Sequence, residues 1–380
     1  MENIYFDNAA TTKLDEEVLN EMIPYLKNNY GNASSIYKLG RESKKAVEES
    51  REKIAEILNC EANEIYFTAG GSESDNTVIK GIARANRKRG NHIITSKIEH
   101  PAVLETCKQL EKEGFEVTYL SVNENGIVDL EELKKSIKES TILISIMFAN
   151  NEIGTIEPIE EIGEIAKEKN IYFHTDAVQA VGSIKIDVQK MNIDSLSISG
   201  HKFYGPKGVG ALYVHEGVEF EKILHGGHQE RDKRAGTENV AGIVGLGKAI
   251  ELASKNLESY NAKLTALREY LLQQVSDHIT ECRLNGSRSN RLPGNANISF
   301  KDIEGDKLLL ELDKRGFCVS AGSACSSGKT EASHVLVAMG VPKEYASGTI
   351  RITLGEENTK EEIDAFVKAL EEIIKTCKSK

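Results

Sequence analysis

The chain has 380 residues, of which 39% are hydrophobic and 28% are charged, which is typical of a globular protein with more than one domain. Its formal net charge of -11 disfavours a nucleic-acid or anionic membrane surface, because both bind clustered lysine and arginine. The longest apolar run, residues 142–149, is far shorter than the roughly 20 residues of a membrane-spanning helix, and the amino-terminal residues do not resemble a secretory signal.

Short runs rich in β-branched and aromatic residues alternate with amphipathic helical stretches through the first part of the chain. This alternation is typical of an open, largely parallel sheet that is covered by helices. Side chains that bind a ligand are then expected at the carboxyl ends of the strands. The predicted strands are Ile65–Thr68, His92–Ser96, Val117–Val122, Ile142–Ala149, Ile171–Thr175, Ser195–Ser199 and Ala211–Val214.

A long helical stretch, from about Asn239 to Val275, precedes a shorter region in which strands and helices mix. The strands are predicted at Asn297–Phe300 and Thr349–Leu354, and the helices at Gly305–Arg315 and Lys360–Thr376. This region predicts a second α+β domain that the long helix joins to the first.

A glycine-rich turn follows the first of the predicted strands, in the segment Phe67–Ser74. Its backbone amides and the start of the next helix suit a phosphate group. An ordinary glycine turn with a serine cap explains the same residues.

Polar side chains follow three further strands. His100, before Pro101, either lies on a planar ring or caps a helix. Asn151 and Gln179 carry amides that can donate to a phenolate oxygen, and a turn is the alternative for the asparagine.

One lysine and one aspartate point to a specific chemistry. Lys202 lies among glycines, hydroxyls and a histidine in the segment Ser199–Pro206, directly after an apolar run, and is a candidate Schiff-base nucleophile. Asp176 ends another apolar run. A lysine bonded to the aldehyde and an aspartate facing the ring nitrogen are the two groups that make pyridoxal phosphate an electron sink. A helix N-cap is the alternative for the aspartate.

Arg351 lies within the apolar strand Thr349–Leu354, where an unpaired guanidinium is costly. A clamp on a substrate carboxylate and a structural salt bridge both satisfy it.

The cysteines are scattered without CxxC pairs, which argues against structural zinc or a disulfide framework and favours a reducing cytoplasm. Cys325 is distinct because small residues surround it in Ser320–Gly328, which predicts an exposed thiol. A reactive thiolate and an incidental loop cysteine both remain open. The other cysteines are Cys60, Cys107, Cys282, Cys318 and Cys377, which we expect to be buried or simply free thiols.

In combination and order, these motifs resemble the class V pyridoxal-phosphate aminotransferase family, and most closely its NifS/IscS-like group I cysteine desulfurases. The resemblance covers the whole length of the chain. It is carried by Tyr5–Thr12, Gly31–Ser35, Gly70–Ser74, Glu99–Pro101, Asn150–Gly154, Asp176–Gln179, Ser199–Pro206, Arg234–Asn239, the Cys325 segment and Arg351.

The resemblance implies fold type I of the pyridoxal-phosphate-dependent transferases, an α/β fold with a mainly parallel seven-stranded sheet. A large cofactor-binding domain is expected at residues 14–256. A smaller α+β domain is expected at residues 1–13 and 257–380, carrying Cys325 and Arg351.

The resemblance also implies a role for each site residue. Lys202 is expected to bind pyridoxal 5'-phosphate covalently, Asp176 to pair with its ring nitrogen, and His100 to stack on its ring. Arg351, with Asn8 and Asn151, is expected to hold the substrate carboxylate. The remaining cofactor contacts are expected from Gly71, Ser72, Asn151, Gln179, Ser199 and His201, and from Thr237 reaching the neighbouring subunit of a homodimer.

The implied reaction is removal of sulfur from L-cysteine, which gives L-alanine and a persulfide on Cys325. The sulfur is expected to pass to an IscU/NifU-like scaffold protein for iron–sulfur cluster assembly, with Cys325 as a transient ligand of that cluster and no intrinsic metal site. A selenocysteine lyase is the nearest alternative, and an aminotransferase of the same fold is a more distant one.

Some positions differ from the family's usual residues. Ser72 replaces a common threonine, Ala33 a proline, Tyr37 a histidine and Asp232 a glycine. The hydroxyl is kept at Ser72, so these differences concern loop detail and the charge at the entrance rather than the reaction.

Overall fold

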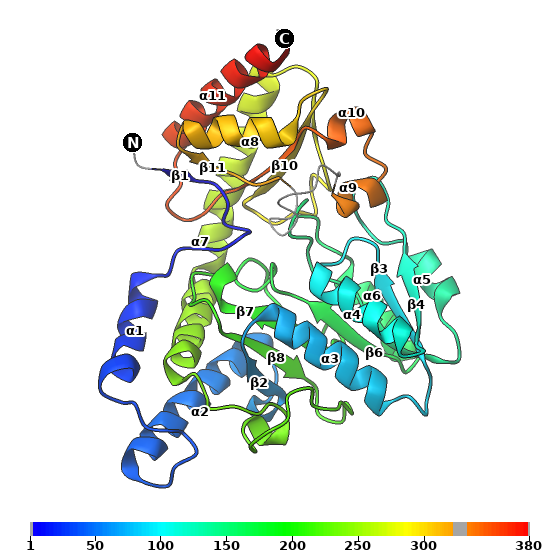
Figure 1. Ribbon diagram of the computed structural model, residues 1–380, viewed down its shortest axis with the longest axis vertical. Helices are drawn as coiled ribbons and strands as arrows, with labels where there is room; N and C mark the ends of the chain where they lie inside the picture. The colour runs from blue at the N-terminus through cyan, green and yellow to red at the C-terminus, as the bar shows by residue number, and fades with distance from the viewer. Residues whose placement is uncertain (1–2, 322–332, 379–380) are drawn as a thin grey trace.

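The computed structural model describes residues 3–321 and 333–378, so Cys325 lies outside the described residues. Figure 1 shows two domains, with α7 (Val240–His278) running from one into the other. At about 1.5 Å per residue, the 39 residues of this helix extend about 58 Å. The predicted joining helix is therefore confirmed.

A seven-stranded sheet forms the centre of the larger domain, in the order β2-β8-β7-β6-β5-β3-β4. Strand β8 runs antiparallel to both neighbours, and all other neighbouring pairs are parallel. The mainly parallel sheet predicted from the sequence is confirmed. Its strands are β2 (Ile65–Thr68), β3 (His92–Ser96), β4 (Glu116–Leu120), β5 (Thr141–Ser145), β6 (Tyr172–Asp176), β7 (Ser195–Ser199) and β8 (Gly210–Val214).

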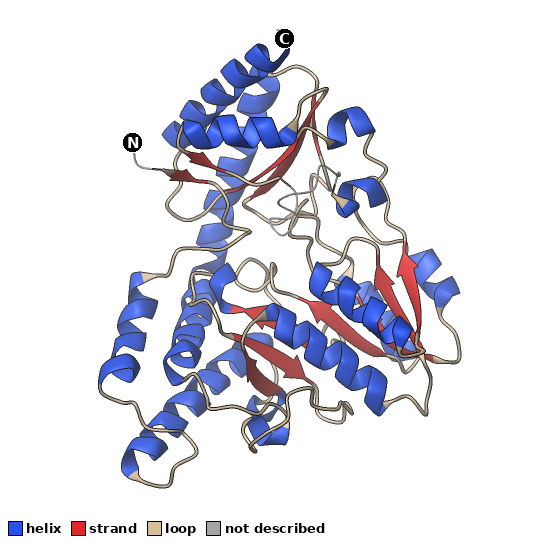
Figure 2. Cartoon of the chain, in the orientation of Figure 1, coloured by secondary structure: helices blue, strands red, loops and turns tan. Residues whose placement is uncertain are grey.

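Helices cover both faces of this sheet (Figure 2). Consecutive residues of one strand belong to different apolar clusters: Ile93 packs with α3 and α4, and Ile94 packs with α2, α6 and α7. Because side chains alternate along a strand, a strand buried on both faces is apolar throughout. The helices of this domain are α1 (Glu16–Lys27), α2 (Lys38–Leu58), α3 (Gly71–Ala85), α4 (Pro101–Lys112), α5 (Leu130–Ser136) and α6 (Ile159–Glu168).

Strand β5 is shorter than the sequence predicted, since it ends at Ser145 rather than Ala149. Beyond Ser145 the backbone amides of Ile146 and Phe148 still donate to β6, at 3.1 and 2.9 Å. The pairing with β3 stops there, because β3 itself ends at Ser96. The last residues of the run bond instead to other segments: the Phe148 carbonyl accepts from the Glu157 amide at 3.0 Å, and Ala149 forms an isolated bridge with Ile156.

The smaller domain holds a three-stranded antiparallel sheet, β9-β10-β12, and a parallel pair, β1-β11. One apolar cluster joins Phe6 near the amino terminus to Leu264 of α7 and to Phe366 near the carboxyl terminus. The two chain ends thus share one core, as predicted, while the boundaries at residues 14 and 256 stay predictions. The elements are β1 (Ile4–Tyr5), β9 (Cys282–Leu284), β10 (Asn295–Phe300), α8 (Gly305–Lys314), β11 (Phe317–Cys318), α9 (His334–Ala338), α10 (Lys343–Ala346), β12 (Thr349–Thr353) and α11 (Lys360–Lys378).

The five cysteines within the described residues are free thiols. In the same part of the chain, none of the helices has the length and apolar composition needed to cross a bilayer.

A buried ion pair fixes the segment before α7 to the edge of the large sheet. Arg51 of α2 makes two 2.8 Å bonds to Glu230, and both side chains are at most 4% exposed. Glu230 also accepts from the backbone amide of Phe67 in β2, at 2.8 Å. The pair therefore joins three separate parts of the chain.

We predict that Glu230→Gln lowers the free energy of unfolding by about 3 kcal/mol, because it removes the buried counter-charge of Arg51 and leaves only the half-exposed Glu48 as an ionic partner. Urea unfolding of the cofactor-free protein measures this change. The matched control is Glu105→Gln in the exposed pair with Lys108, where we expect a change below about 0.5 kcal/mol. Equal effects of the two variants would contradict the assigned role of the buried pair.

Candidate active site between the two domains

A cavity of about 290 Å³ lies where the large sheet meets the small domain. Strands β6 and β7 of the large sheet and β12 of the small one all contribute to its lining. Most of the predicted site residues meet there. They are Gly71, Ser72, His100, Asn151, Asp176, Gln179, Ser199, His201, Lys202 and Arg351.

Lys202 ends a short 3-10 turn (Gly200–Lys202) that follows directly from β7. Two glycines make this turn tight: a Cβ on Gly205 would lie 2.7 Å from the carbonyl oxygen of Gly200. The Lys202 ammonium donates to the carbonyl oxygens of Ala9 and Ala10, at 2.5 and 2.9 Å. The amine is thereby held at the cavity wall by backbone acceptors.

Asp176 lies at the carboxyl end of β6 and is 6% exposed. Its Oδ1 accepts from the backbone amide of Val178 at 2.9 Å in a turn, and no helix begins there, so the helix N-cap alternative is wrong while the position in the cavity is observed. Burial raises the pKa of Asp176, while His100, the Val178 amide and Lys202 act in the opposite direction.

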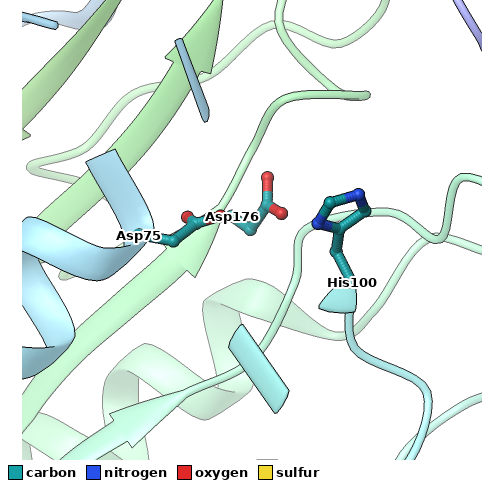
Figure 3. A group of neighbouring side chains, drawn as sticks. All are labelled: Asp75, His100 and Asp176. Atoms are coloured by element: carbon teal, nitrogen blue, oxygen red, sulfur yellow. The ribbon is translucent and has the colours of Figure 1, made fainter. Parts of the chain in front are cut away.

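His100 has one of the two roles that the sequence left open, the helix cap, and its stacking on a ring stays a prediction. It is the N-cap of α4, where its Nδ1 accepts from the backbone amide of Ala102 at 3.1 Å, and it lines the cavity beside Asp176 (Figure 3). Burial lowers the pKa of His100, and Lys202 adds to this effect while Asp176 opposes it. A lowered pKa favours a neutral imidazole at pH 7, which can stack on an aromatic ring.

The other end of the cavity fits a phosphate group. Helix α3 begins at Gly71, and a Cβ there would lie 2.5 Å from a methyl carbon of Val178, so only glycine allows this close approach. The amides at the helix start and the hydroxyls of Ser72 and Ser199 are donors suited to an anion. Burial, followed by Lys202 and Lys207, lowers the pKa of the adjacent His201 to about 4.

Arg351 is 1% exposed in β12 and forms the small-domain side of the site. Its Nη2 lies 2.8 Å from Asp7 Oδ1, and its Nη1 donates to the carbonyl oxygen of Asn151 at 3.1 Å. Its Nε has no hydrogen-bond partner among the described residues. The structural salt bridge, one of the two alternatives for Arg351, is therefore present. The Nε donor of Arg351 is not used by this salt bridge.

Two predicted site residues lie outside this lining, and a third falls outside the described residues. Asn8 donates to the carbonyl oxygen of Thr353 at 2.9 Å and lines a neighbouring cavity of about 480 Å³. Thr237 is exposed and is not part of the described lining. Cys325 belongs to the segment that the structure does not describe. Their roles stay predictions.

Sequence reasoning missed Asp7, the partner of Arg351, and Asp75, a fully buried carboxylate of α3 that lines the cavity. A signal for Asp75 existed, because it falls on the same helix face as the apolar residues Ile79 and Ile82. A charged residue on such a face calls for an explanation.

The unusual residue Asp232 has a structural explanation. Its φ is 64°, in the left-handed region that glycine adopts most easily, which accounts for a preference for glycine there. The aspartate side chain bonds to Lys222 at 2.9 Å and to His228 at 3.0 Å on the surface.

Comparison with known proteins places the chain in a family. A family model described as aminotransferase class V matches residues 4–366. A protein of Clostridium botulinum named cysteine desulfurase IscS is 58% identical over 374 residues, which is 98% of this chain and 94% of that protein. A protein of the same name from Methanosarcina thermophila is 56% identical over 99% of this chain and 93% of its own length.

Solved structures agree with the sequence relatives. A NifS-like protein superimposes with a TM-score of 0.93 at 42% identity, covering 98% of this chain and all of that one. A cofactor-free cysteine desulfurase from Thermococcus onnurineus gives a TM-score of 0.88 at 27% identity, over 98% of this chain and 95% of the other. From its sequence match and its fold together, the chain belongs to the aminotransferase class V family.

Proposed function

We propose that this chain is a cysteine desulfurase that binds pyridoxal 5'-phosphate and transfers sulfur from L-cysteine to Cys325. The observation that supports this most is the meeting of Lys202, Asp176 and Arg351 at one cavity. The relatives with 56% and 58% identity that carry this name support the choice of substrate. The alternative, selenocysteine lyase, has no observation in its favour.

The cavity provides matching partners for the parts of the cofactor. Lys202 would hold the aldehyde, Asp176 would pair with the ring nitrogen, and the start of α3 would bind the phosphate. When bound, the cofactor withdraws electrons from the α-carbon of an amino acid.

The protein's own side chains perform the remaining steps. Arg351 binds the substrate carboxylate by its free donor capacity and orients the α-carbon toward the Lys202 amine. That amine then removes the α-proton and later returns a proton, so the substrate keeps its hydrogen count. Asp176 retains its negative charge and so stabilises a protonated ring nitrogen.

Sulfur leaves the substrate by attack of the Cys325 thiolate. A sulfur–sulfur bond forms, the carbon–sulfur bond of cysteine breaks, and its electron pair stays with the carbon, which becomes the methyl group of alanine by taking up one proton, equal to the proton released when the Cys325 thiol ionised. The products are L-alanine and a persulfide on Cys325, and a scaffold protein for iron–sulfur cluster assembly accepts the outer sulfur of that persulfide.

A homodimer completes the phosphate site through Thr237, whose exposure in the single chain is compatible with a partner contact. A cytoplasmic location stays a prediction.

We predict that Cys325→Ser keeps the cofactor and its visible absorption but releases no sulfide from L-cysteine in the presence of a reductant. The matched control is Cys60→Ser, because burial raises the pKa of the Cys60 thiol to about 12 and keeps it protonated. Sulfide and alanine are measured together. Wild-type turnover by Cys325→Ser would contradict the persulfide role.

Lys202→Ala is expected to abolish covalent cofactor attachment, because no other amine is placed in the described cavity lining. Borohydride treatment followed by mass spectrometry should find the cofactor adduct on Lys202 in the wild type and in the control Lys190→Ala, whose lysine pairs with Glu160 on the surface. An adduct at a different lysine would overturn the assignment.

Arg351→Ala is expected to weaken L-cysteine binding by roughly 2 to 5 kcal/mol, because a desolvated carboxylate loses its counter-charge. The measurement is the substrate concentration dependence of sulfide release and of the change in cofactor absorption. Arg315→Ala, in the exposed pair with Glu372, is the control and should leave both unchanged. An unaltered KM and kcat in Arg351→Ala would argue against carboxylate binding.

A further inference from the structure

Asp75 is a buried carboxylate to which the proposed reaction assigns no step. It lies in the second turn of α3, is 1% exposed, and lines the central cavity. Its Oδ1 has no hydrogen-bond partner among the described residues. A buried acceptor without a partner is costly, so its charge state needs a physical account.

The nearest charged neighbour of functional importance is a second carboxylate. Oxygen atoms of Asp75 and Asp176 and a ring nitrogen of His100 all lie within 4.8 Å of one another. Figure 3 shows the Asp176 carboxylate between the other two side chains. Two negative charges this close in a buried site repel strongly, so such a pair binds one proton.

The basic groups near Asp75 do not neutralise it. His174 Nε2 lies 3.7 Å from Asp75 Oδ1, but burial lowers the pKa of His174 to about 3, so its ring is uncharged at pH 7. Glu99, the other titratable group facing the site, adds negative rather than positive charge when ionised. Burial raises the pKa of Glu99 to about 8, which favours its neutral form.

The surroundings decide which member of the pair holds the proton. Asp176 accepts a hydrogen bond from the backbone amide of Val178, and Lys202 and His100 lie nearby. All three favour the charged form of Asp176. Asp75 has the repulsion of Asp176 and the desolvation of complete burial, against one hydrogen bond from the Ser197 hydroxyl. The proton therefore belongs on Asp75 and the negative charge on Asp176.

We propose that Asp75 and Asp176 form a carboxylic acid–carboxylate pair in which Asp75 donates to Asp176. Asp75 is then a positioning residue: it orients the Asp176 carboxylate and keeps its charge available for the protonated ring nitrogen of the cofactor. This inference rests on the proposed function for the cofactor's presence, whereas the pair itself is a property of the protein alone.

The pair has a consequence for stability that needs no cofactor. A carboxyl group with a raised pKa keeps its proton in the folded protein after the unfolded chain has lost it, so stability falls as pH rises from about 4 through the folded-state pKa. Asp75→Asn removes this decrease of stability with pH, because the asparagine side chain does not ionise. The melting temperature of the variant, relative to the wild type, is therefore expected to increase with pH over that window.

A double-variant cycle in the cofactor-free protein isolates the coupling. Asp75→Asn, Asp176→Asn and the double variant are compared with the wild type by thermal unfolding from about pH 5 to pH 8, the range in which a raised carboxyl pKa acts on stability. We expect the pH-dependent effect of Asp75→Asn on stability to be smaller when Asp176 is already neutral, with the part caused by burial remaining. The chelator EDTA is present throughout, because Asp75, His100 and Asp176 lie close enough to hold a stray cation.

Glu157→Gln provides the matched control. Glu157 is as deeply buried, burial raises its pKa to about 8, and Asp176 is not among the causes of that shift. Its stability change with pH should be the same with and without Asp176→Asn. If the stability changes caused by Asp75→Asn and Asp176→Asn were also additive within error, the proposed pairing of the two carboxyl groups would be wrong.

Cofactor binding tests the positioning role. Asp75→Asn keeps a donor at the same place, so its affinity for pyridoxal 5'-phosphate, followed by absorbance, should stay within about twofold of the wild type. Asp75→Ala loses the donor and should bind about tenfold more weakly or worse. Equal losses in both variants, or none in Asp75→Ala, would overturn the role.

The outcome for the cofactor can be told apart from the outcome for the pair. If the wild type failed to bind pyridoxal 5'-phosphate, the proposed function would fall while the cycle in the cofactor-free protein still reported on Asp75 and Asp176. If the wild type bound it and the cycle were additive, the proposed function would stand and the pair would fall.

Discussion

The parallel alignment of β5, β6 and β7 is the constraint on which the rest of the structure depends. Parallel neighbours end at the same edge of the sheet, so the residues that follow Ser145, Thr175 and Ile198 emerge together. Asp176 and Lys202 are 26 positions apart in the sequence, yet they line one cavity for this reason. The antiparallel β8 returns the chain beside β7, and β2 then brings the start of α3 to the same edge.

The small domain supplies the arginine of the site, Arg351, which lies opposite the carboxyl edge of the large sheet. Arg351 comes from an antiparallel sheet in a different core; its bond to Asp7 lies within the small domain, and its bond to the Asn151 carbonyl crosses to the large one. Helix α7 contributes to both apolar cores, which fixes the distance between them. A substrate carboxylate at Arg351 therefore meets the Lys202 amine only when the two domains pack as they do here.

The balance of buried charge is the second theme of the site. Asp75, Glu99 and Asp176 are all buried, and of the three only Asp176 has a lysine among the neighbours that favour its ionised form. Neutral imidazoles at His100 and His174 add no positive charge, because burial lowers the pKa of both. The region can thus carry one negative charge, on Asp176, that would pair with a cationic ring nitrogen.

The sequence by itself determined the alternation of strands and helices, the long joining helix and most of the site residues. These follow from local patterns: apolar runs, glycines that allow close approach, and reactive side chains placed directly after strands. It did not determine that His100 both caps α4 and lines the cavity, nor that Arg351 already pairs with Asp7. Those facts depend on distances between residues far apart in the chain. The pairing of Asp75 with Asp176 is of the same kind, because only the packing of α3 against β6 brings these two buried carboxylates together.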